Sequence, residues 1–89
     1  MSDEQSLAQV LRDARGARTQ TIEDLCRQTG LSANVVRGLE SGRFDVVEPI
    51  YLRLALQVLG PHLGLDSRDL VARLERELGV ETEAPAVLP

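Results

Sequence analysis

The chain has 89 residues, of which 43% are apolar and 27% are charged, and this balance predicts one globular domain with a small core. Its net charge of −4 argues against a surface that attracts nucleic acid everywhere, and its two aromatic residues, Phe44 and Tyr51, are too few for a single-strand stacking platform. The lone Cys26 cannot form an internal disulfide, and the longest apolar runs are too short for a leader or a membrane span, so a cytoplasmic protein is expected.

The first two helices are predicted from their capping residues. Ser2 and Gln5 have the spacing of a capping box, and the apolar residues that follow recur at helical intervals to about Gly16. Thr21 and Asp24 have the same spacing and open a second, shorter helix. Both segments therefore begin with a polar side chain that can satisfy free backbone N–H groups.

A third helix is expected between Ser32, as its N-cap, and Gly42, as its left-handed stop. Gly30 has the corresponding place at the end of the second helix. The residues of the third helix that repeat at helical spacing and are expected to face inward are Val35, Val36 and Leu39.

The fourth helix is predicted for residues 49–59, with Pro49 in its first turn. Apolar side chains cover about two thirds of its circumference, so Arg53 and Gln57 form its only polar edge. Such a helix lies at the centre of the fold, or its outer face meets another chain. Gly60 and Pro61 are expected to kink or end it, because proline lacks an N–H donor.

Asp66 is placed to cap a fifth helix, Gly79 to end it, and Asp69 and Arg73 to pair on its outer face. Its inward residues are expected to be Leu70, Val71, Leu74 and Leu78. Residues 80–89 combine acidic residues and prolines without periodicity, which predicts a disordered tail after a domain of residues 1–79.

The segment of residues 21–42 meets the requirements of a helix-turn-helix. Leu25 is an anchor of the first helix, Cys26 is small where the helices touch, and Gly30 allows the tight turn. Val36 and Leu39 follow as inward residues of the second helix. We therefore predict an all-α, five-helix, repressor-like helix-turn-helix domain, with a generic helical hairpin as the alternative.

The segment TIEDLCRQTGLSANVVRGLESGRFD resembles the Cro-repressor type of helix-turn-helix, through Leu25-Cys26, Gly30-Leu31-Ser32 and residues 39–43. About 75 residues are also similar to the cytoplasmic domain of the RodZ-like family of bacterial cell-shape proteins, through residues 7–18, Phe44-Asp45, residues 49–53 and residues 63–66. This second resemblance implies docking of the actin-like filament protein MreB on the fourth helix. The candidate partner-binding residues are Tyr51, Leu52, Arg53 and Leu56.

The repressor geometry would place the start of the third helix in the major groove of double-stranded DNA. The candidate DNA-binding residues are Arg18, Ser32, Asn34, Arg37 and Arg43. An asparagine can pair with adenine and an arginine with guanine. Residues 12–43 hold six arginines against four carboxylates, so their small positive surplus predicts modest affinity, from about two to four phosphate contacts, a number that a dimer would double.

Catalysis is not expected, because no nucleophile and base have a suggestive spacing and no glycine loop could cradle a phosphate. His62 lacks a second ligand, so no metal site is predicted. No cofactor and no small-molecule substrate are predicted either. Glu40 is expected to pair with an arginine of the first helix. The function predicted is that of a small DNA-binding transcriptional regulator, homodimeric through the apolar face of the fourth helix. The alternative is a RodZ-like adaptor that binds a filament and no DNA.

Overall fold

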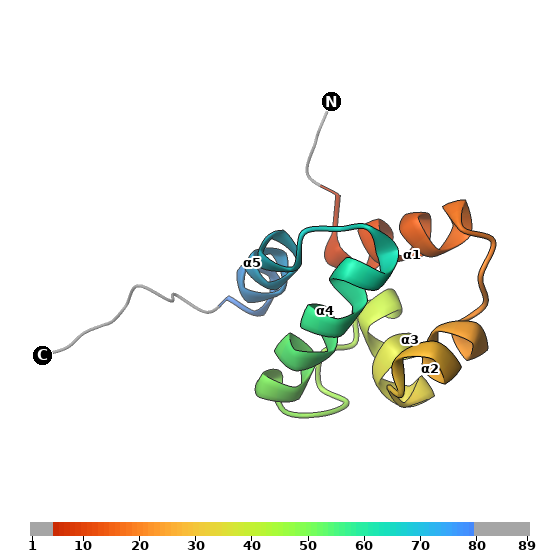
Figure 1. Ribbon diagram of the computed structural model, residues 1–89. Coiled ribbons are helices and arrows are strands. Elements are labelled where there is room, and N and C mark those ends of the chain that lie inside the picture. The colour runs from red at the N-terminus through yellow and green to blue at the C-terminus, as the bar shows by residue number, and fades with distance from the viewer. Residues whose placement is uncertain (1–4, 80–89) are drawn as a thin grey trace, which may run out of the picture.

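The computed structural model describes residues 5–79, which form five α-helices and no strand (Figure 1). The helices are α1 (Leu7–Ala17), α2 (Ile22–Thr29), α3 (Ala33–Ser41), α4 (Pro49–Leu63) and α5 (Ser67–Leu78). The predicted all-α fold is confirmed. The predicted cap at Ser2 and the predicted disordered tail lie outside the described residues. Between residues 5 and 79, no helix is both long and apolar enough to cross a membrane.

Four of the five helices begin with a side-chain cap, and α4 begins with Pro49 instead. The Ser6 hydroxyl accepts a hydrogen bond from the Gln9 backbone N–H (3.1 Å), so the N-cap of α1 is Ser6 and not the predicted Ser2. The predicted capping box of α2 is confirmed, because Thr21 and Asp24 each accept the other's backbone N–H at 3.0 Å. These two hydrogen bonds satisfy N–H groups that the first turn of α2 leaves free.

Helix α4 runs across the middle of the fold and packs against α2, α3 and α5 (Figure 1). Every helix contributes leucine or valine to one continuous core. Its fully buried side chains include Leu7, Leu11, Leu25, Val36, Leu39, Leu52, Leu56, Leu59, Leu70 and Leu74. Burial of this kind is the main favourable free energy available to a domain of this size.

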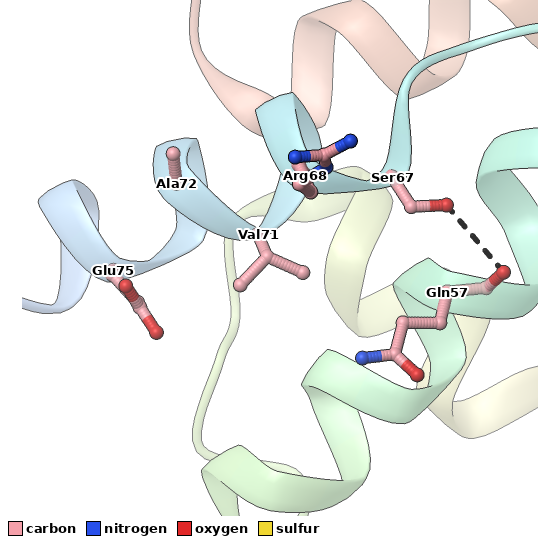
Figure 2. A pocket seen from close by; sticks show the side chains of 6 residues that line it. All are labelled: Gln57, Ser67, Arg68, Val71, Ala72 and Glu75. Atoms are coloured by element: carbon pink, nitrogen blue, oxygen red, sulfur yellow. Dashed lines mark hydrogen bonds between the residues drawn. The ribbon is translucent and has the colours of Figure 1, made fainter.

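The prediction that α4 ends or kinks at Gly60 and Pro61 is wrong in its boundary, because the helix continues to Leu63 and Gly64 ends it in the left-handed conformation. Pro61 cannot donate to the Gln57 carbonyl, and this carbonyl instead accepts a 3.5 Å hydrogen bond from the Ser67 hydroxyl of α5 (Figure 2). The replacement donor comes from another helix, so the sequence pattern of α4 alone could not reveal it.

Gly60 allows α5 to come this close to α4. A Cβ at Gly60 would lie 2.4 Å from the Ser67 Oγ and 3.1 Å from the Leu65 carbonyl oxygen. The two helices diverge beyond this point around a hollow of about 340 Å³, lined by Gln57, Ser67, Arg68, Val71, Ala72 and Glu75 (Figure 2).

Candidate nucleic-acid interface

The turn between α2 and α3 positions α3 at the surface. Gly30 ends α2 with a φ of +81°, a conformation that costs glycine little, and Ser32 caps α3 two residues later. Leu25, Val36 and Leu39 anchor the two helices in the core, as predicted. The opposite face of α3 is left to solvent.

The outer face of α3 exposes the residues predicted to read DNA. Ser32, Asn34 and Arg37 are all exposed, and the Arg37 side chain keeps 61% of its accessible surface. The Ser32 hydroxyl accepts the Val35 backbone N–H at 3.2 Å, which fixes its orientation at the helix start. Arg37 has an ionic neighbour in Glu23, at 3.7 Å between exposed side chains, and such pairs are weak in water.

Asn34, Arg37 and Arg43 line one shallow hollow of about 320 Å³, which we call the recognition hollow. Gly38, Ser41 and Val46 complete its wall. The lining contains two guanidinium groups, an amide and a hydroxyl, and no carboxylate. This combination offers hydrogen-bond donors and positive charge to an anionic ligand.

Two glycines place Arg43 in this hollow. Gly42 ends α3 with a φ of +76°, and the Arg43 N–H then donates to the Gly38 carbonyl at 2.8 Å. A Cβ at Gly38 would lie 2.8 Å from the Arg43 carbonyl oxygen and 2.9 Å from Val46 Cγ2. The loop after α3 can therefore fold back against the helix only because Gly38 has no side chain.

An ion pair between α1 and α3 fixes the inner side of α3. Glu40 is 5% exposed and accepts hydrogen bonds from the Arg15 Nε and Nη2, each at 2.8 Å. The predicted pairing of Glu40 with an arginine of the first helix is confirmed. The hydrogen bonds from Arg15 to Glu40 are the main cause that raises the pKa of the Arg15 guanidinium, so this guanidinium remains charged at all ordinary pH values.

Arg18 lies apart from the other predicted DNA-binding residues. It follows the last residue of α1 as its C-cap, and its Nη2 would be 3.0 Å from a Cβ at Gly64. Gly64 ends α4, so the guanidinium lies at the C-terminus of that helix, where the helix dipole favours a positive charge. The structure does not bring Arg18 into the recognition hollow.

The structure corrects the residues predicted to bind a partner on α4. Leu52 and Leu56 are fully buried in the core and cannot form a docking surface. Arg53 pairs with Glu75 of α5 at 3.1 Å rather than forming an edge with Gln57. Of the predicted four residues, Tyr51 is the one that is exposed, at 56%.

The other large exposed apolar residues of the described chain also belong to α4. Together with Tyr51 they form a surface that we call the α4 stripe, which consists of Ile50, Tyr51, Leu54 and Val58. These positions repeat at intervals of three and four residues, so they share one face of the helix. One face of α4 is therefore central in the fold, as expected, and the other face is exposed to solvent.

Sequence reasoning missed Gly38, Ser41 and Val46 in the recognition hollow. Gly38 carried a usable signal, because a glycine inside a helix costs about 1 kcal/mol relative to alanine and so indicates a close approach. The sequence gives no comparable signal for Ser41 and Val46, since their place in the hollow depends on how the loop after α3 folds back.

The sequence model of a family described as a helix-turn-helix domain matches residues 10–70, from α1 into α5. The matched segment contains α2, α3 and all six residues of the recognition hollow. No curated protein and no solved structure is similar enough to match the chain.

Proposed function

We propose that this chain, which belongs to the helix-turn-helix domain family, binds double-stranded DNA with the outer face of α3 in the major groove and acts as a small transcriptional regulator. The observation that carries the proposal is the recognition hollow, where Asn34, Arg37 and Arg43 converge and no carboxylate lines the wall. Family membership supports nucleic-acid binding, and the hollow supplies the side chains for it.

Each side chain has a chemical role in this proposal. The Asn34 amide donates to and accepts from the edge of adenine, and the Arg37 guanidinium donates two hydrogen bonds to guanine. Arg43 lies beyond the C-terminus of α3 and binds a phosphate, which adds affinity without selecting a sequence. The weak contact between Arg37 and Glu23 breaks when the groove offers stronger acceptors.

Substitution of the two arginines tests the proposal. In a duplex library selected for binding, Arg37→Gln lowers affinity and relaxes the base preference, whereas Arg43→Gln lowers affinity equally for all sequences. Arg76→Gln serves as the control, because Arg76 is exposed on α5 and outside the recognition hollow. Unchanged affinity of both the Arg37 and the Arg43 variants in a gel-shift assay would refute the proposal.

We further propose that the α4 stripe joins two copies of the chain. Tyr51 and Leu54 leave about half of their side chains in water, and a contiguous apolar patch of this kind marks an interaction site. A symmetric dimer would double the phosphate contacts of one domain. Leu54→Glu should shift sedimentation towards the monomer while the helical circular dichroism spectrum stays unchanged; a wild-type chain that remains monomeric at high concentration contradicts the proposal.

A second candidate function, that of a RodZ-like adaptor, rests on the same exposed Tyr51. In this alternative the α4 stripe binds an actin-like filament protein such as MreB, and DNA has no role. Tyr51→Ala then abolishes pull-down of the filament protein with the fold intact, and the wild-type chain shows no affinity for random duplex even at low salt. Binding of the wild-type chain to random duplex at low salt would favour the DNA-binding function over the adaptor function.

A further inference from the structure

The outer face of α3 forms a ridge with a hollow on each side. Arg37 and Ser41 line the recognition hollow and also a second hollow of about 400 Å³. The second hollow lies between α1 and α3, and its other lining residues are Arg12, Arg15, Ile22 and Glu40. Arg43 lines the first hollow and Arg12 the second, so one arginine flanks the ridge on each side.

The two arginines of α1 in the second hollow differ in what their charges face. Arg15 is held by the Glu40 carboxylate, which neutralises it. Arg12 donates instead to two neutral acceptors, the Glu40 backbone carbonyl and the Gln9 Oε1 at 2.9 Å. Between residues 5 and 79, no carboxylate lies within ion-pair distance of Arg12, so its charge remains available to a ligand.

The two hydrogen bonds also hold the Arg12 side chain in place before any ligand arrives. A guanidinium has five N–H donors, and these bonds use two of them, so three remain for an anion. The ordering cost of the side chain is partly met within the fold, which favours binding.

We propose that Arg12 and Arg43 bind phosphates on opposite strands of the duplex, one on each side of the major groove that α3 enters. The proposal rests on the proposed DNA-binding function. A major groove is about 12 Å wide and is bordered by two sugar-phosphate backbones, so a helix in the groove has one backbone on each flank. An arginine on each side of the α3 ridge matches this arrangement.

The first test measures the salt dependence of binding to one library-selected duplex for wild type, Arg12→Gln, Arg43→Gln and the Arg76→Gln control. Each phosphate contact contributes about 0.9 to the slope of log affinity against log salt, or about threefold in affinity between roughly 50 and 200 mM. Arg12→Gln and Arg43→Gln should each reduce the slope by about this amount, and Arg76→Gln should leave it unchanged. A full slope for Arg12→Gln overturns the assignment of Arg12.

The second test changes the charge of the DNA and combines this with the same protein variants. Neutral methylphosphonate linkages are placed along the binding site in one strand or in the other, and wild-type affinity should fall in both cases. Arg12→Gln should become insensitive to neutral linkages in one strand, and Arg43→Gln to those in the other. Loss of wild-type affinity with only one of the two modified strands overturns the inference. If the wild-type protein shows no salt-dependent binding to any duplex, the proposed function itself is refuted.

Discussion

Helices α3 and α4 pack against each other in the same core, yet their outer faces have opposite chemistry. The α3 face is polar and cationic and is flanked by two hollows, whereas the α4 stripe is apolar. The inner faces explain how the domain folds, because both bury apolar side chains in one core, to which α3 adds the buried Glu40. The outer faces carry the information about function, because only they can meet another molecule.

Two leucines of α4 that are two residues apart test this division most strongly. Leu56 is 0% exposed and Leu54 is 50% exposed on the same helix. Leu56→Ala should lower the free energy of unfolding by about 2–5 kcal/mol, and Leu54→Ala by less than about 0.5 kcal/mol. Urea denaturation of the two variants measures the difference. Equal losses would mean that the α4 stripe belongs to the core.

The ion pair beneath α3 gives the next largest expected effect. Glu40→Gln leaves the partly buried Arg15 without its carboxylate and should cost about 2–3 kcal/mol in thermal or urea unfolding. The matched control is Asp69→Asn on α5, whose pair with Arg73 joins a more exposed carboxylate, at a cost of about 0.5 kcal/mol or less. Similar losses of stability in the two variants would show that the packing of α3 against α1 does not depend on the charge of Glu40.

Gly38 lies where the loop after α3 packs against the helix and brings Arg43 to the recognition hollow. Gly38→Ala places a Cβ against the Arg43 backbone and Val46, and should destabilise the domain by about 1–2 kcal/mol and also reduce duplex affinity. Gly16→Ala in α1 meets no atom within 4 Å and should stabilise by up to about 1 kcal/mol with affinity unchanged. If Gly38→Ala keeps full duplex affinity, Arg43 does not need this loop geometry.

The smallest expected effect on stability concerns the start of α2, the helix that precedes α3 in the helix-turn-helix. The pKa of Asp24 is lowered chiefly by the hydrogen bond from the Thr21 backbone N–H. Since its folded pKa lies below its unfolded value, this group stabilises the fold above about pH 4, and the stabilisation is lost as pH falls through the folded pKa. Asp24→Asn should therefore lose stability at neutral pH and show a flatter acid dependence in melting experiments; identical pH profiles would exclude this role.

The sequence predicted the local features of the fold because short-range chemistry decides them. The caps at Thr21 with Asp24, Ser32 and Asp66 and the stops at Gly30, Gly42 and Gly79 all act within a few residues, and the structure has them as predicted. The extension of α4 past Pro61 was missed, because the donor that replaces the lost hydrogen bond is Ser67 on another helix.

The candidate site was predictable in part for the same reason. Asn34 and Arg37 follow from the place of α3 in the motif, and both are exposed. Leu52 and Leu56 were assigned to a partner surface because α4 is apolar over most of its circumference, so its pattern could not show which side faces the core. The convergence of Arg43 with α3 depends on Gly38 and the returning loop, which spacing does not reveal.

A nuclear magnetic resonance titration of the ¹⁵N-labelled chain with a random DNA duplex at low salt locates the face that binds DNA. Chemical shifts should change along α3 and the loop after it, including Ser32, Asn34, Arg37 and Arg43, while the α4 stripe is unaffected by added duplex at constant protein concentration. Changes confined to the α4 stripe, or no changes at all, would contradict DNA binding by α3.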